Sequence, residues 1–284
     1  MQRLEHSFAV FVILLIVIAD STPSFAQTRI KNLSEYSPAP RVFSPMGCRG
    51  LGLNGHVHSD VGDEVGALGN RAFVENYDMS ESISRSDTFD IVHYALDLDL
   101  TNYSLQQMQA RALIAVSVIE SGAEEIWFDL VSLTVDSVNI DGASSGFVHE
   151  NGRLIVPSPN AVFQSGDAHE IEVFYGGHPE QDPSWGGVYF TAGYIYHMGI
   201  GLTSIPPNYG KVWHPCFDNF VERATYSWNI RSADGMEAHL QGTFLGETFE
   251  EGDTLTRSFI LEHPITTHCA AFAVSSYVDS NFVH

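Results

Sequence analysis

Apolar and polar residues alternate with a period of two along most of the chain after residue 87. In DIVHYALDLDL, residues 90–100, the apolar side chains fall on one face and Asp97 and Asp99 on the other; the apolar set is Val92, Tyr94, Leu96, Leu98 and Leu100. The same alternation recurs in ARALIAVSVI, EIEVFYGG and ATYSWNIR. Because successive side chains of a β-strand point to opposite faces, the pattern predicts half-buried strands of the antiparallel kind.

Turn signals separate these predicted strands at intervals of about ten residues, which is typical of an all-β domain. They include Asp141-Gly142, Asn151-Gly152 and Asp234-Gly235. No amphipathic helix of about a dozen residues stands out. The pattern therefore predicts an all-β fold, either a β-sandwich or a large curved antiparallel β-sheet, and excludes the Rossmann, TIM-barrel and α/β-hydrolase folds.

The first residues predict an export signal rather than part of the fold. Arg3 precedes the unbroken apolar run FAVFVILLIVIA, whose length suits a signal peptide and is too short for a bilayer span. Pro23 follows. Ser24 and Ala26 are small residues at the two positions that a signal peptidase reads, so cleavage is expected after Ala26. We therefore expect a signal peptide over residues 1–26 and export to the periplasm, the cell surface or the medium. A buried core helix and a retained membrane anchor are the alternatives.

Residues 27–86 are rich in Gly, Ser and Pro and show no sustained period, so they predict a poorly ordered leader before a β domain over residues 87–284. The leader holds His56, His58 and Asp60 in a spacing that suits a metal. A solvated loop is the favoured interpretation, because a Gly-rich tract gives a metal site little support.

Composition and charge narrow the classes of function. The chain has 284 residues, of which 44% are hydrophobic, so it can bury a sizeable core. Asp and Glu number 35 against 13 Lys and Arg, and the formal charge is -22. Binding to nucleic acid or to an anionic membrane needs basic patches, so neither is expected. The three cysteines are too few for a disulfide scaffold.

Several common catalytic motifs are absent from the sequence. There is no P-loop, CxxC pair or HExxH. The pairs His149-Glu150 and His169-Glu170 both lack a second histidine four residues after the first. We therefore expect no catalytic residue and no metal site in this chain.

One further cluster and one aromatic stretch leave alternatives open. His214, Cys216 and Asp218 alternate in WHPCFD, and His263, His268 and Cys269 lie near the end, which makes a Cys/His metal site conceivable. A buried, inert Cys216 is favoured, and a Cys216–Cys269 disulfide stays open. The stretch from Trp185 to Trp213 suits either a ligand-binding face or core packing, with packing favoured.

A set of short motifs follows in a fixed order. They are Tyr175, Gly177 and Pro179; Gly186, Gly187 and Tyr189; Pro215, Cys216 and Asp218; and Arg223, Ala224, Thr225 and Tyr226. In this order they resemble the N-terminal domain of the aminopeptidase N family of zinc metallopeptidases, and the resemblance covers roughly residues 87–281. It implies a saddle-shaped antiparallel β-sheet domain that precedes a catalytic domain with HExxH and a zinc ion.

The resemblance also implies what this chain would lack. No catalytic or metal-binding position of the family exists within it, so zinc is expected only in the missing catalytic domain. The family's amine anchor, a Glu or Gln nine residues before the Pro of the Pro-Cys-x-Asp box, falls on Pro206. A proline side chain accepts no hydrogen bond, so simple aminopeptidase specificity is in doubt. The box itself is interpreted as structural, with Asp218 capping local N–H groups or pairing with Arg223.

Three hypotheses of function follow. The favoured one is a non-catalytic N-terminal domain, from a fragment or a truncated copy of an exported metallopeptidase. Its partners would be the catalytic domain of the same polypeptide and a peptide substrate. The alternative is a self-standing secreted β-sandwich that binds peptide or glycan through its aromatic stretch. An independent metalloenzyme that uses the His and Cys groups is the third.

Overall fold

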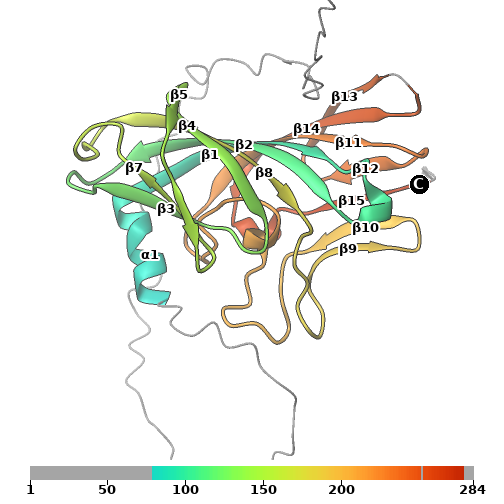
Figure 1. Ribbon diagram of the computed structural model, residues 1–284, viewed down its shortest axis with the longest axis horizontal. Coiled ribbons are helices and arrows are strands. Elements are labelled where there is room, and N and C mark those ends of the chain that lie inside the picture. Colours follow the sequence, from blue (N-terminus) through green and yellow to red (C-terminus); the bar gives the residue numbers. More distant parts are fainter. Residues whose placement is uncertain (1–78, 251, 278–284) are drawn as a thin grey trace, which may run out of the picture. The chain divides into compact units, whose positions relative to one another are not determined.

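A computed structural model describes residues 79–250 and 252–277, all of which belong to the compact unit His58–His284. The predicted signal peptide, Cys48, the histidines at positions 56 and 58 and most of the predicted leader lie outside the described residues. Strands make up most of the described part, so the prediction of an all-β fold is confirmed (Figure 1). No helix within that part is long and apolar enough to cross a membrane.

The largest sheet has eight strands in the order β13-β14-β11-β1-β2-β8-β4-β5. Its strands are β1 (Phe89–Asp99), β2 (Met108–Val118), β4 (Thr134–Ile140), β5 (Ala143–Ser145), β8 (Ala168–Gly177), β11 (Ala224–Ser232), β13 (Thr243–Phe249) and β14 (Leu255–Ile265). All neighbours are antiparallel except β1 and β11, which run parallel with His93 opposite Thr225. The sheet is therefore mixed, whereas the sequence predicted an antiparallel one.

Two smaller sheets pack against the large one (Figure 1). The four-stranded sheet has the order β12-β15-β10-β9, and the three-stranded sheet has the order β3-β7-β6. Their strands are β9 (Gly187–Thr191), β10 (Tyr194–Met198), β12 (Glu237–Leu240), β15 (Phe272–Ser275), β3 (Glu125–Asp129), β6 (Val148–Glu150) and β7 (Arg153–Pro157). Three 3-10 turns connect strands: η2 (Tyr103–Leu105), η3 (Gly210–Val212) and η4 (Thr267–Cys269). One continuous hydrophobic core fills the space between the sheets.

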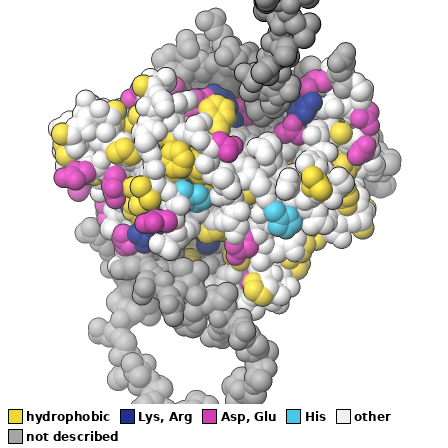
Figure 2. All heavy atoms as spheres, viewed as in Figure 1, with side chains coloured by type: hydrophobic (Ala, Val, Ile, Leu, Met, Phe, Trp, Pro, Cys, Tyr) yellow, Lys and Arg dark blue, Asp and Glu magenta, His cyan; other side chains and the backbone are white. Residues whose placement is uncertain are grey.

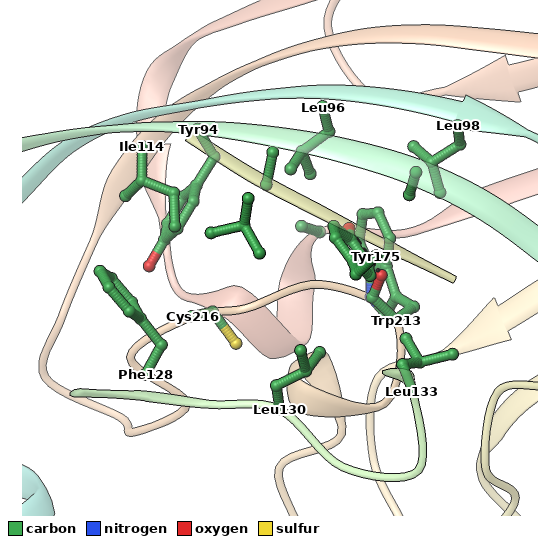
Figure 3. Close-up of a cluster of buried hydrophobic side chains, with 14 of the residues drawn as sticks. Tyr94, Leu96, Leu98, Ile114, Phe128, Leu130, Leu133, Tyr175, Trp213 and Cys216 are labelled. Carbon is green, nitrogen blue, oxygen red and sulfur yellow. Dashed lines mark hydrogen bonds between the residues drawn. The ribbon is translucent and has the colours of Figure 1, made fainter. Parts of the chain in front are cut away.

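The core is rich in aromatic side chains (Figure 3). Tyr94 stacks on Tyr226 with ring centroids 5.1 Å apart. Trp213 is fully buried next to Tyr175, whose hydroxyl donates to the Trp213 backbone oxygen at 3.0 Å. Of the side chains predicted to face inward, Tyr94, Leu96, Leu98 and Leu100 are buried, but Val92 is only half-buried. A bulge between residues 91 and 93 shifts the alternation by one position, so Ile91 is buried instead.

One helix, α1 (Met79–Thr88), precedes the first strand and includes the end of the predicted leader. Its Arg85 is buried, stacks on the rings of Trp127 and Phe217, and forms an ion pair with Asp129. The described secondary structure therefore begins before Asp87, the residue at which the sequence predicts the β domain to start. The helix was missed because MSESISRSDT has few apolar residues to mark a period.

Candidate functional site

The Pro-Cys-x-Asp box lies in the interior of the domain. Pro215, Cys216 and Asp218 are all buried. Cys216 pairs with the end of β3 through two backbone hydrogen bonds, Asp129 N to Cys216 O at 2.8 Å and Cys216 N to Asp129 O at 3.1 Å. Burial raises the pKa of the Cys216 thiol well above its ordinary value, so this cysteine is an inert part of the core, as favoured from the sequence.

The two C-terminal cysteines are separate free thiols. Cys216 is buried in the core, and Cys269 is exposed at the end of η4. Cys269 accepts a hydrogen bond from the Thr266 hydroxyl at 3.4 Å. The Cys216–Cys269 disulfide that the sequence left open is therefore absent.

Asp218 fixes the segment that precedes the box. Its carboxylate accepts hydrogen bonds from the Thr267 hydroxyl at 2.6 Å and from the Lys211 backbone N–H at 3.2 Å, and the Lys211 ammonium lies 3.4 Å away. Burial acts to raise the pKa of Asp218, but the Lys211 charge and these hydrogen bonds outweigh it and lower the pKa. The backbone N–H group that Asp218 caps is thus that of Lys211. Arg223 is exposed just before β11.

The Gly-Gly pair is required by close backbone contacts. Both glycines have positive φ, 139° at Gly186 and 91° at Gly187. A Cβ at Gly186 would lie 2.2 Å from the carbonyl oxygen of Ile200, and one at Gly187 would lie 2.3 Å from that of Glu180. Gly186 therefore lets the start of β9 lie directly against the loop that follows β10, and Gly187 lets it lie against the segment that follows β8.

That loop, residues 199–209, carries Pro206 in a cis Ile205-Pro206 peptide bond and is braced by one carboxylate. Asp182 is buried and accepts hydrogen bonds from the Ser204 hydroxyl at 2.7 Å, the Thr203 N–H at 3.0 Å and the Trp185 N–H at 3.0 Å. Burial acts to raise the pKa of Asp182; the hydrogen bonds, Ser204 foremost, outweigh it and hold the pKa well below its usual range.

Pro206 lines an open groove of about 1100 Å³ between the Pro206 loop, α1 and the three-stranded sheet. Lys211 and Asp129 lie in the same groove, together with Glu180, whose carboxylate accepts a hydrogen bond from the Ser132 hydroxyl. The side chain of Pro206 itself accepts no hydrogen bond. The groove nevertheless contains carboxylates from neighbouring segments.

Next to Pro206 the loop exposes three large apolar side chains, and Trp185, which precedes β9, adds a fourth. We name these four the loop patch: Trp185, Ile200, Leu202 and Ile205. Their exposed fractions are between 47% and 63%. The backbone holds them together, since Leu202 N donates to Trp185 O at 2.9 Å. Exposed apolar clusters on a braced loop are typical of contact surfaces. The aromatic stretch is therefore divided, because Tyr209 and Trp213 are buried in the core.

The histidines of the two C-terminal motifs do not form a metal centre. No group of three or more His, Cys, Asp or Glu suited to a metal occurs in residues 79–250 and 252–277. His214 is fully buried against Trp213, with ring centroids 4.2 Å apart, and burial lowers its pKa to about 3. His263 is exposed on β14.

The histidines of the two His-Glu pairs in the sequence each contact a different partner. His149 contacts the carbonyl oxygen of Leu130, and His169 pairs with Asp141 at 2.7 Å. No sequence motif marks the residues that matter most for the geometry of the site. These residues are Asp182, Lys211 and Thr267. Asp-Pro at residues 182–183 was the one local signal of a turn.

Comparisons with known proteins agree with the fold. No protein-family profile matches the sequence, and no curated protein does. The M1 zinc metallopeptidase from Deinococcus radiodurans is similar in structure, with a TM-score of 0.60 and 21% sequence identity. A mutant of that enzyme bound to a Tyr-Ser-Ala substrate is similar with a TM-score of 0.60 and 22% sequence identity. A two-domain M1 zinc metallopeptidase mutant bound to L-arginine is similar at 0.60 and 21%.

Each of these matches covers 66% of this chain and 42% of the solved chain, so the present chain spans less than half of their length. The motifs quoted from the sequence predicted this likeness, and the structure confirms it at the level of the fold. The described domain thus has a β fold found in M1 zinc metallopeptidases.

Proposed function

We propose that this chain is a non-catalytic N-terminal β domain of an exported zinc metallopeptidase that resembles aminopeptidase N. In this proposal the domain forms one wall of the peptidase cleft and supports a catalytic domain of the same polypeptide, which holds the zinc ion. The observation that carries the proposal is the fold, shared with M1 zinc metallopeptidases over 42% of their chain. The signal peptide that the sequence predicts over residues 1–26 supports the proposed location.

The loop patch supports the existence of a large partner surface. Trp185, Leu202 and Ile205 are about half-exposed. The backbone beside them is nevertheless fixed, because the N–H groups of Trp185 and Thr203 donate to Asp182 and that of Leu202 donates to Trp185 O. A soluble monomer gains nothing from ordering apolar side chains in water, whereas a docked domain buries them at roughly 25 cal/mol per Å². We propose that the catalytic domain covers this patch.

Peptide is the proposed substrate of the complete enzyme, as it is for the solved neighbour bound to Tyr-Ser-Ala. The Pro206 loop would then face the cleft. Because Pro206 offers no side-chain acceptor to a substrate ammonium group, we expect a preference other than that of a simple aminopeptidase.

Two measurements on the purified 284-residue chain test the proposal. The chain is expected to release no amino acid from aminoacyl or peptide substrates, because it lacks the ligands and base that activate a zinc-bound water. Analytical ultracentrifugation with a hydrophobic dye at moderate salt is expected to show self-association or dye binding. Substituting Leu202→Glu and Ile205→Glu together removes two of the four apolar side chains of the loop patch and should reduce both signals.

A matched control uses Leu245→Glu, since Leu245 is equally exposed at 60% but lies on β13, away from the Pro206 loop. This control should leave association and dye binding unchanged. A wild-type chain that is a cooperative, dye-silent monomer contradicts the docking proposal, and zinc-dependent turnover by the pure chain contradicts the non-catalytic role.

A further inference from the structure

The groove beside Pro206, which we name the Pro206 groove, is formed by segments that lie far apart in the sequence. Helix α1, the hairpin of β6 and β7, and the Pro206 loop all contribute residues to its lining. Its volume of about 1100 Å³ compares with the roughly 300–1,000 Å³ of ligand pockets. The groove therefore has room for a ligand of several residues, and the chemistry of its lining decides which ligand it favours.

The two basic side chains that line the groove are already paired. Arg153 donates to both carboxylate oxygens of Glu81, at 3.0 and 2.6 Å. The Lys211 ammonium donates to the carbonyl oxygen of Asn208 and lies 3.4 Å from the buried carboxylate of Asp218. The charges of both cations are therefore compensated by their own partners and do not neutralise the other carboxylates of the groove.

Two exposed carboxylates, those of Glu150 and Glu180, line the groove and form no ion pair with a residue in the described part of the chain. Glu180 accepts one hydrogen bond, from the uncharged hydroxyl of Ser132. His149 also lines the groove and donates from Nε2 to the carbonyl oxygen of Leu130 at 2.9 Å, so in its uncharged form its other nitrogen is an acceptor. The groove thus offers acceptors and uncompensated negative charge.

A third carboxylate, that of Asp129, reaches the groove from the core. Asp129 is only 3% exposed, and both Arg85 and the backbone N–H of Asp218 bond to its Oδ2. Its Oδ1 has no hydrogen-bond donor within residues 79–250 and 252–277. Because buried polar atoms almost always have a partner, this open oxygen points to a donor that a ligand in the groove would supply.

Apolar side chains line the same groove, among them the half-buried Val131 and Ile155 and the ring of Pro206. No group of three or more carboxylates, histidines or cysteines suited to a metal ion occurs in the described part of the chain, so the carboxylates do not form a metal centre. The charge of -22 on the chain attracts cations, and Figure 2 shows acidic side chains in large excess over basic ones on the visible face. Apolar walls with carboxylates suit a cation that is carried on a hydrocarbon stem.

We propose that the Pro206 groove binds the basic side chain of a peptide, lysine or arginine, through the carboxylates of Glu150 and Glu180, with Asp129 Oδ1 as a further acceptor. The methylene stem of either side chain packs on the apolar lining, and the charged end donates hydrogen bonds to the carboxylates. The α-ammonium group of a peptide has no such stem and leaves the apolar lining uncovered. The inference rests on the proposed function in that the ligand is a peptide, and it names the class of peptide that the complete enzyme would favour.

Four short peptides, all amidated at the C-terminus, test the proposal on the purified 284-residue chain. Three are acetylated at the N-terminus and carry lysine, arginine or the uncharged norleucine between two alanines, and the fourth is trialanine with a free amino group. Binding is measured by calorimetry and saturation-transfer NMR at low salt. The lysine and arginine peptides should bind. The norleucine peptide lacks the charge and trialanine lacks the stem, so both should bind at least tenfold more weakly.

Glu150→Gln combined with Glu180→Gln removes two negative charges and keeps the size of both side chains, so it should weaken binding of the lysine peptide about tenfold. The matched control combines Glu170→Gln with Glu262→Gln. These exposed residues lie on β8 and β14, outside the groove, and their substitution changes the net charge of the chain equally. The control should bind like wild type, and thermal unfolding checks that both double variants are folded.

Three outcomes would overturn the proposal. Neither basic peptide binds at millimolar concentration, or the norleucine peptide or trialanine binds as well as the lysine peptide, or the two double variants bind the lysine peptide equally. None of these outcomes bears on the non-catalytic peptidase role, since the binding test needs no catalytic domain. Zinc-dependent turnover by the pure chain would contradict that role and leave the binding result intact.

Discussion

Arg85 and Asp129 form an ion pair in which the two side chains are only 5% and 4% exposed. The same Asp129 oxygen accepts a hydrogen bond from the backbone N–H of Asp218 at 2.8 Å. One carboxylate therefore joins helix α1, the end of β3 and the Pro-Cys-x-Asp box. Because both charges are buried, each depends on the other for compensation.

Arg85→Ala is expected to destabilise the domain by about 3–5 kcal/mol, since it leaves Asp129 as an uncompensated buried charge. Urea unfolding followed by fluorescence measures the change. Arg153→Ala is the control: Arg153 also stacks on Trp127, but its pair with Glu81 is 30% and 46% exposed, so about 1 kcal/mol or less is expected. Equal losses for the two variants would contradict the role given to the buried pair.

Three buried histidines are expected to make the fold sensitive to mild acid. Burial lowers the pKa of His93 and of His197 to about 4, and that of His214 to about 3. The unfolded chain therefore takes up protons below pH 6.5, while the folded chain does not until about pH 4. Stability is complete above pH 6.5 and falls between these limits, by about 2 kcal/mol per histidine at pH 5.

Urea midpoints measured at pH 7.5, 6 and 5 check this expectation. His93→Gln keeps a polar side chain near its partners Thr225 and Ser227, at 2.7 and 2.9 Å, and should flatten the pH dependence by about one third. A stability that is constant from pH 7.5 to pH 5 would show that these side chains are not buried in the neutral form.

Asp182→Ala is expected to loosen the Pro206 loop, because the N–H groups of Ser184, Trp185 and Thr203 lose their acceptor. Each of these part-buried hydrogen bonds contributes about 0.5–1.5 kcal/mol. Hydrogen exchange should become faster at these three amides while the strands of the large sheet stay protected. Asp182→Asn keeps one acceptor oxygen and should have a smaller effect; uniform exchange changes throughout the domain would contradict a local brace.

Export is expected to remove residues 1–26. When the full chain is expressed in a bacterium, the mature protein should begin at Gln27 and be found outside the cytoplasm. N-terminal sequencing of the fractionated product measures this. An intact Met1 on a membrane-bound product would favour the retained anchor instead.

The strands were predictable because the alternation of apolar and polar residues is a local property of the sequence. The motifs around the Pro-Cys-x-Asp box were predictable because each is a short segment. Helix α1 was not predictable, since Arg85 is the polar residue that anchors it and its partner Asp129 is 44 residues away. The brace at Asp182 depends in the same way on Ser204, 22 residues later. Local patterns carry no information about which distant donors meet one carboxylate, and the loop patch became visible only with the fold.

The parallel pairing of β1 with β11 has a consequence for how the chain reaches its native state. His93 lies beside Ser227, yet 134 residues separate them, and β11 also supports β14 and β13 beyond it. During synthesis or secretion, the first strand of the domain must wait for residues near 232 before its second edge can be covered. Until then that edge remains open to pairing with other chains, so the long wait for β11 is the stage at which a chaperone would protect this protein best.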